Sequence, residues 1–199
     1  MAKDNQTTKT DVTVVDAKPR RKRHLVLIVA IIVLVAVGAG GYFAYARHKH
    51  NVAANNAILQ HGLESDLSTA LDSSNGDQTV VYATTNLING AQSGKFQISN
   101  SKLGWYHMDR ANAYVNLNNN KQAVPDYEAA AQLDSSLKLP AMQGEFQSRY
   151  ATGERQQLIP LLQQLVQLEN NSQNPMRSSE AAQYQDDIQA IQHGQEITF

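Results

Sequence analysis

The sequence predicts an all-α protein in which one transmembrane helix precedes a domain of antiparallel helical hairpins. Three observations predict this fold class. An uncharged run of 22 residues matches the thickness of a bilayer, apolar residues later in the chain recur with the period of an α-helix, and short turn-forming segments separate these patterns. We expect a cytoplasmic, disordered basic tail at 1–24, a transmembrane helix at 25–46, a juxtamembrane segment at 47–54 and the helical domain at 55–199.

Residues 25–46 form the expected transmembrane helix. At about 1.5 Å per residue they span the roughly 30 Å hydrocarbon core of a bilayer. Twelve of them are Leu, Ile, Val or Phe, and at roughly 0.3–0.6 kcal/mol each their insertion is favourable by about 5 kcal/mol. Tyr42, Phe43 and Tyr45 gather at one end, where aromatic rings favour the headgroup level.

The basic residues that flank this run predict its orientation. Five lysines and arginines lie in residues 18–24 and two in residues 47–50. Because the more basic flank stays in the cytoplasm, we expect a cytoplasmic N-terminus and an extracytoplasmic C-terminal domain. The expected location is therefore the cell membrane.

Two further interpretations concern the same run. Residues 44–46 fit the small-x-small cleavage site of a signal peptide, but cleavable apolar regions are usually about 7–15 residues long, so we favour an anchor. Ala36, Gly40 and Ala44 form a small-xxx-small stripe through which two such helices can associate, although small residues are common in any transmembrane helix.

The charge is distributed unevenly along the chain. Residues 1–50 carry nine lysines and arginines against three aspartates, a net charge of +6, and the remainder carries eight basic and fifteen acidic groups, a net charge of −7. An acidic domain argues against nucleic-acid binding, which needs a positive face. The chain has no cysteine, which excludes disulfides, thiolate catalysis and cysteine-based zinc sites.

Beyond residue 51 the apolar pattern predicts seven helices. The clearest has a single apolar stripe made of Leu158, Leu161, Leu162, Leu165 and Leu168. The expected helices are 52–72, 77–90, 101–118, 121–134, 140–151, 154–170 and 178–193. The segments between them are rich in turn-forming residues, at 73–77, 118–120, 151–153 and 171–175. Helices joined by such short turns are antiparallel neighbours.

The small and aromatic residues of one hairpin are regularly spaced. Ala111, Tyr114, Ala123, Tyr127 and Ala130 have successive spacings of 3, 9, 4 and 3. This spacing resembles that of the tetratricopeptide repeat (TPR), in which alanines lie where two helices cross closely and aromatic rings fill the space beside the crossing. The resemblance implies a helix pair near 104–117 and 121–134.

A second segment extends the resemblance to a repeat. Residues 122–136 align with residues 157–171 at an offset of 35, with Gln, Pro, Gln and Leu identical. The first hairpin departs from the family pattern at His107, where tryptophan is usual, and at Arg110, where leucine is usual. Three hairpins and a closing helix would form a TPR-like α-solenoid, and an unrelated helical bundle is the alternative.

The sequence contains no constellation that predicts catalysis. It lacks a nucleotide-binding glycine loop and the motifs of serine hydrolases and zinc proteases. We expect His107 to be a buried, hydrogen-bonded histidine, and we expect the pairs Asp126/Glu128 and Asp186/Asp187 to face solvent. The prediction is therefore a protein that is no enzyme and has neither a cofactor nor a metal site.

The TPR resemblance implies a binding groove on the first helix of the best hairpin. The partner-binding residues that it implies are Trp105, Met108, Asp109, Asn112 and Asn116. Asn112 stands where peptide-terminus-binding members carry asparagine, but Met108 stands where they carry lysine, so a neutral groove lined by amides and an aromatic ring is favoured. Trp105 is the expected anchor, and its alternative role is to pack against the connection at 91–100.

These observations together predict a membrane-anchored protein–protein interaction module. It would act in assembly or as a chaperone, binding an envelope or secreted protein or peptide through its TPR-like groove, and would not bind nucleic acid. The alternative is a structural protein that self-assembles through the solenoid or the transmembrane helix. A homo-oligomer is therefore the second possible partner arrangement. The C-terminal residues Ile197 and Phe199 are apolar. We expect them to fold back over the last helix, and binding to a PDZ-type groove is the less favoured alternative.

Overall fold

A computed structural model describes the backbone of residues 20–171 and 177–197, and within these ranges all side chains except those of residues 20–34, 36, 156, 177 and 178. These residues contain seven α-helices, one 3-10 helix and no strand, so the all-α prediction is confirmed. The elements are α1 (Arg20–Leu71), α2 (Asp77–Gln92), α3 (Asn100–Asn116), α4 (Asn120–Leu133), η1 (Ser135–Leu137), α5 (Lys138–Ala151), α6 (Arg155–Asn170) and α7 (Arg177–Gln192).

Six of the expected helices agree with the structure to within about two residues at most ends. The first differs, because α1 begins at Arg20 and continues without interruption to Leu71. Residues 47–54 contain neither glycine nor proline, so nothing there terminates a helix. The chain nevertheless divides into two units between Asn51 and Val52.

The N-terminal unit holds the expected transmembrane helix. Residues 25–34 and 36 of that segment lie outside the described side chains. The described apolar side chains of the segment, from Val35 to Tyr45, are exposed. Among the residues that the structure describes, no helix has both the length and the apolar character needed to cross a membrane.

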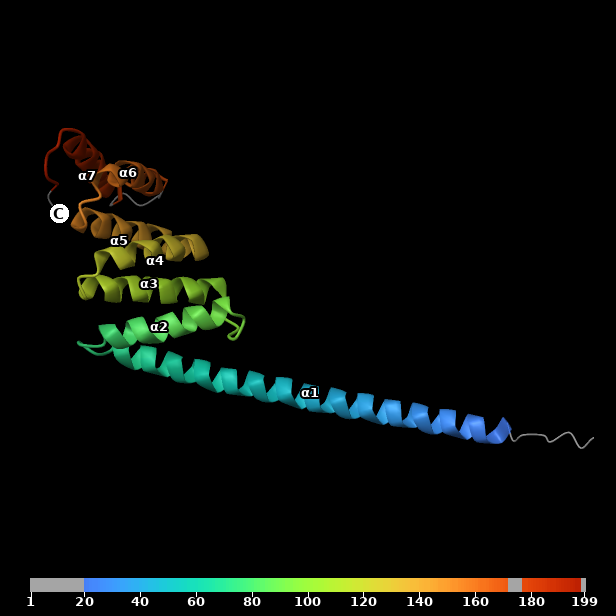
Figure 1. The fold of residues 1–199 in the computed structure, drawn as a ribbon. Coiled ribbons are helices and arrows are strands. Elements are labelled where there is room, and N and C mark those ends of the chain that lie inside the picture. The colour runs from blue at the N-terminus through green and yellow to red at the C-terminus, as the bar shows by residue number, and fades with distance from the viewer. Residues whose placement is uncertain (1–19, 172–176, 198–199) are drawn as a thin grey trace, which may run out of the picture. The chain divides into compact units, whose positions relative to one another are not determined.

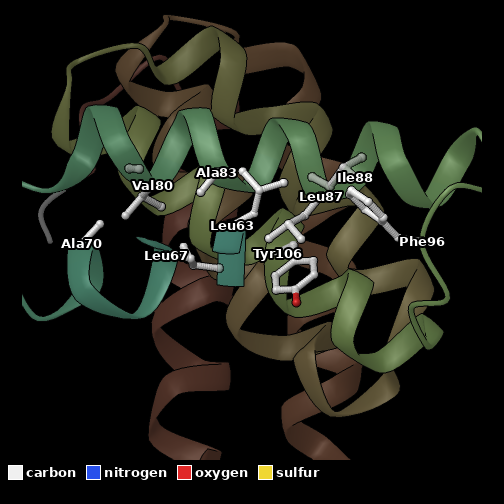
Figure 2. Close-up of a cluster of buried hydrophobic side chains, with 10 residues drawn as sticks. Leu63, Leu67, Ala70, Val80, Ala83, Leu87, Ile88, Phe96 and Tyr106 are labelled. Carbon is white, nitrogen blue, oxygen red and sulfur yellow. The ribbon is translucent and has the colours of Figure 1, made fainter. Parts of the chain in front are cut away.

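In the C-terminal unit each helix packs against the next in chain order. Contacts join α2 to α3, α3 to α4, α4 to α5, α5 to α6 and α6 to α7 (Figure 1). The first of three buried clusters joins the last turns of α1 to α2 and α3, as Figure 2 shows. Its members are Leu63, Leu67, Ala70, Val80, Ala83, Leu87, Ile88, Phe96, Tyr106 and Ala113.

The second cluster lies where α3 crosses α4. Ala111, Ala123 and Ala130 are fully buried there, and Tyr127 is buried beside them. The ring of Tyr127 also lies against α5, because a Cβ added to Gly144 would stand 2.4 Å from it. The alanines therefore mark close helix crossings, as their spacing predicted.

The third cluster joins α5, α6 and α7. Leu158, Leu161, Leu162 and Leu165 form its buried centre, which confirms the predicted apolar stripe. The chain then folds back, because Ile197 is buried in this cluster and its carbonyl oxygen lies 3.4 Å from the hydroxyl of Tyr150. The expected folding back is thus observed for Ile197, whereas Phe199 lies outside the described residues.

Helices α4 and α6 bury equivalent positions. At the offset of 35 residues, Ala123 corresponds to Leu158, Tyr127 to Leu162 and Ala130 to Leu165, and all six side chains are buried. Pro125 and Pro160 also correspond, and each is the sixth residue of its helix. The packed helix pairs and this shared burial register are compatible with a helical repeat.

The long connection between α2 and α3 is held in place by one aromatic side chain. Phe96 is buried, and its backbone N–H donates to the carbonyl oxygen of Gly90 over 3.0 Å. A Cβ on Gly90 would stand 2.0 Å from the Phe96 ring, so the glycine is needed for this contact. At the next connection Asn118 has a φ of 60°, which matches the turn predicted at 118–120.

Candidate functional site

Three of the five predicted partner-binding residues line one cavity. Asp109, Asn112 and Asn116 follow one another on α3 at helical spacing, and the cavity has a volume of about 260 Å³. We call it the α3 cavity. The residues that line it are Ala70, Leu71, Ser73, Ser74, Asp77, Val80, Asp109, Asn112, Ala113 and Asn116.

The two amides of the α3 cavity are each oriented by a hydrogen bond. The side-chain amide of Asn116 donates to Oδ1 of Asp77 at the start of α2, over 2.9 Å. The hydroxyl of Tyr127 donates to Oδ1 of Asn112 over 2.7 Å. The carbonyl oxygen of Asn112 thus accepts from the α4 side, and its NH₂ group keeps both N–H donors.

Asp109 is the half-buried carboxyl of the α3 cavity. Burial raises its pKa to about 6, because the charged form loses hydration without a compensating partner. Within the part of the chain that the structure describes, Asp109 forms neither a hydrogen bond nor an ion pair. Besides the predicted Asp109, the cavity contains a second acidic residue, Asp77, so it is more acidic than the neutral groove that was favoured.

The other two predicted residues lie outside the α3 cavity. Trp105 is one helical turn before Asp109 on the same stripe of α3, and half of its surface (50%) is exposed. Met108 is half-buried and packs against the second cluster. The structure thus places Trp105 on an accessible face, whereas Met108 contributes to the packing of the second cluster.

A buried polar network ties together α2, α3 and α4. Asp126 accepts hydrogen bonds from Arg110 over 2.6 and 2.7 Å, and its Oδ1 lies 2.7 Å from Nδ1 of His107. Arg110 also donates to the hydroxyl of Thr85 over 3.1 Å. Burial alone would raise the pKa of Asp126, but the hydrogen bonds from His107 and Arg110 and the charge of Arg110 hold it below its usual value.

The buried carboxylates correct two predictions, and the network confirms a third. Asp126 was expected to face solvent, yet it is buried, because it lies on the same stripe of α4 as Ala123 and Ala130. Asp187 is likewise buried and accepts a hydrogen bond from Gln183 over 3.1 Å. The expectation that His107 is a buried, hydrogen-bonded histidine is confirmed.

A second and larger cavity lies between α4, α5 and α6 and has a volume of about 680 Å³. Arg149 lies at its edge and forms ion pairs with Glu145 over 2.7 Å, Glu128 over 2.5 Å and Glu154 over 2.8 Å. Its guanidinium group is therefore satisfied by the chain itself. Sequence analysis did not identify this cavity, because its walls come from helices whose mutual register is set only by packing.

The site residues that sequence analysis missed are Ser73, Ser74 and Asp77. They belong to the turn predicted at 73–77, so the available signal was a polar turn directly before a helix. Among the described side chains, no group of three or more His, Asp or Glu is arranged to hold a metal ion. No family model, curated protein or solved structure matches the chain.

Proposed function

We propose that this protein is a single-pass membrane protein whose C-terminal unit is a TPR-like solenoid that binds a protein or peptide partner. The binding site is the α3 cavity together with the neighbouring Trp105. The observation that carries this proposal is that α3 presents Asp109, Asn112 and Asn116 in one cavity, on the same stripe as a half-exposed indole. Exposed aromatic side chains beside oriented polar groups are typical of binding hot spots.

The TPR-like architecture is supported by agreement between spacing and burial. The alanines whose spacing resembles the repeat are fully buried where α3 and α4 cross. The equivalent positions of α6 are filled by buried leucines. The C-terminal unit also continues as antiparallel pairs, with α7 packed against the last of them.

The membrane anchor is supported by sequence and by exposure. Residues 25–46 contain no charged side chain, and α1 is helical throughout them. The apolar side chains described there are exposed to solvent, an arrangement that lipid contact would stabilise. The basic residues before the run favour a cytoplasmic N-terminus and an extracytoplasmic C-terminal unit, which would meet an envelope or secreted partner.

The anchor is tested by extraction of membranes with alkaline carbonate. The full chain is expected to stay in the membrane pellet, and a variant that lacks residues 25–46 is expected to move to the supernatant. Protease added to sealed vesicles should digest the C-terminal unit when the extracytoplasmic side of the membrane faces outward. It should leave the unit intact when the cytoplasmic side faces outward. Release of the full chain by carbonate would contradict the anchor, and digestion from the cytoplasmic side would contradict the orientation.

Partner binding is tested by site-specific photocrosslinking in native membranes. A photoreactive side chain at Asn112 is expected to capture a partner, and the same group at Gln122, which is exposed on α4, is the matched control. Trp105→Ala should weaken the crosslink by tenfold or more, about 1.4 kcal/mol of binding, and leave the melting temperature within a degree. Equal capture from both positions, or a melting temperature lowered by several degrees, would contradict this assignment.

Self-assembly is the second candidate function, and exposed apolar side chains on the first hairpin favour it. Val52, Ile58 and Leu59 on α1 and Tyr82 on α2 are all exposed, Ile58 to 72%. The outer face of a terminal hairpin is usually polar, so these residues are suited to a contact with a second copy. Light scattering of the detergent-solubilised chain separates the two candidates, because a strictly monomeric particle excludes self-assembly.

A further inference from the structure

Asp109 differs from eight other recessed carboxylates of the C-terminal unit. Each of these eight accepts a hydrogen bond or forms an ion pair: Glu64, Asp77, Asp126, Glu128, Asp134, Glu145, Glu154 and Asp187. Asp109 forms neither in the part of the chain that the structure describes. A recessed carboxylate without a counter-charge is costly, so its position calls for a cation from outside.

Among the side chains that the structure describes, no basic one lines the α3 cavity. Arg110 follows Asp109 directly in the sequence, but its guanidinium group is held by Asp126 on α4 and Thr85 on α2. Lys102, also on α3, pairs with Glu64 over 2.8 Å. The described residues thus supply no internal cation to Asp109.

The remaining lining of the α3 cavity suits a cationic side chain. Asp77 accepts from Asn116 with one carboxylate oxygen and keeps its other oxygen as an acceptor. The hydroxyls of Ser73 and Ser74 add further acceptors. The apolar wall of Leu71 and Val80 can cover the methylene groups of a lysine or arginine, as such stems require.

The size of the cavity limits what can enter it. Small-molecule pockets usually have roughly 300–1,000 Å³, and the α3 cavity with about 260 Å³ is smaller. It therefore accepts one long side chain rather than a folded element. The net charge of −7 on residues 51–199 would also draw a basic segment toward this unit.

We propose that a lysine or arginine side chain of the partner enters the α3 cavity and pairs with Asp109. The ammonium or guanidinium group then lies between Asp109 and Asp77, and a neighbouring partner residue packs on Trp105. This inference rests on the proposed function and specifies the chemistry of its partner: a segment with one basic residue beside an apolar one.

The test uses the full chain in detergent micelles and a fluorescent nonapeptide library in which only the central residue is fixed. Pools with central lysine or arginine are expected to bind at least tenfold more tightly than pools with central alanine or glutamate. Asp109→Asn should abolish this preference. Asp186→Asn is the matched control, because it removes the same charge from an exposed position on α7, and it should keep the preference.

The outcomes separate this inference from the proposed function. If all pools bind equally and Trp105→Ala abolishes their binding, the α3 face binds peptides, but the proposed recognition of a basic residue is wrong. If Asp109→Asn and Asp186→Asn keep the same preference for basic pools, general acidity rather than the cavity attracts them, and the inference is overturned. If no pool binds to the folded chain, both proposals fail. The melting temperature of Asp109→Asn, expected at or above that of the native protein, verifies folding.

Discussion

Replacing Arg110 with methionine is expected to lower the free energy of unfolding by roughly 3 kcal/mol at neutral pH. Removing one partner of a buried ion pair usually costs about 3–5 kcal/mol, because the other charge stays buried without compensation. Asp126 would be that charge, and Arg110 donates to both of its carboxylate oxygens. The lower end of the range is expected because His107, 2.7 Å from Asp126, remains beside the carboxylate as a polar partner.

The effect of this substitution should depend on pH in a defined direction. In the native protein the pKa of Asp126 is held below its usual value, so its ionised form stabilises the fold at pH values above the unfolded-state pKa of about 3.9. That contribution is lost as the pH falls through the lower, folded-state pKa. In Arg110→Met the pKa of Asp126 should rise, so the difference in stability between the two proteins should shrink below about pH 4.

Urea unfolding at pH 7 and at about pH 3 measures both expectations. The double variant Arg110→Met/Asp126→Asn is the control, because it removes the charge together with its partner. It should be less destabilised than Arg110→Met alone, which would show that the cost is that of an unpaired carboxylate. The single variant Asp126→Asn completes the comparison. If the loss of unfolding free energy in the double variant equals the sum of the losses in Arg110→Met and Asp126→Asn, the ion pair is contradicted.

Leu165→Ala is the second substitution with a large expected effect, a loss of roughly 2–5 kcal/mol. Leu165 is fully buried in the third cluster, so truncation removes apolar contacts and leaves a cavity. Its equivalent in the preceding hairpin is Ala130, which is also fully buried but lies at a close crossing. There the opposite change, Ala130→Leu, is expected to cost about 1–3 kcal/mol through overpacking.

Both substitutions are measured by urea unfolding with exposed controls. Leu59→Ala on α1 and Ala182→Leu on α7 make the same chemical changes at exposed positions. They are expected to change the free energy of unfolding by no more than about 0.5 kcal/mol. A fully tolerated Ala130→Leu would mean that α3 and α4 are not held closely at this point.

The sequence alone predicted the helices and their crossings well, and for a physical reason. Apolar periodicity and small residues act locally, so Ala123, Ala130 and the leucine stripe of α6 could be assigned to buried faces before their partners were known. The start of α1 was misplaced because the boundary was inferred from a change in polarity. A helix ends at a stop signal, and residues 47–54 contain none.

The buried charges could not be predicted in the same way. Asp126 was interpreted as a surface residue because a carboxylate usually is one, and its partners His107 and Arg110 lie on another helix. These are two of the positions at which the hairpin departs from the TPR pattern. The structure shows that both residues contact Asp126, so both departures serve one network.

The candidate site was predicted on one side only. Asp109, Asn112 and Asn116 share a stripe of α3, which helical spacing reveals. Ser73, Ser74 and Asp77 complete the α3 cavity from the preceding hairpin, and no local pattern encodes the register between hairpins. The unpaired state of Asp109 also depends on that register, so it required the structure.

The difference between the alanine crossing of α4 and the leucine-filled face of α6 limits how this chain can be extended. The two hairpins bury the same positions. The alanines of α4 allow close approach of the neighbouring helix, whereas the leucines of α6 fill a wider space between helices. A copy of the α3–α4 hairpin inserted after α6 would bring methyl groups to a surface shaped for isobutyl groups. The hairpins are therefore not interchangeable modules, and an engineered longer array would have to rebuild the junction that follows α6.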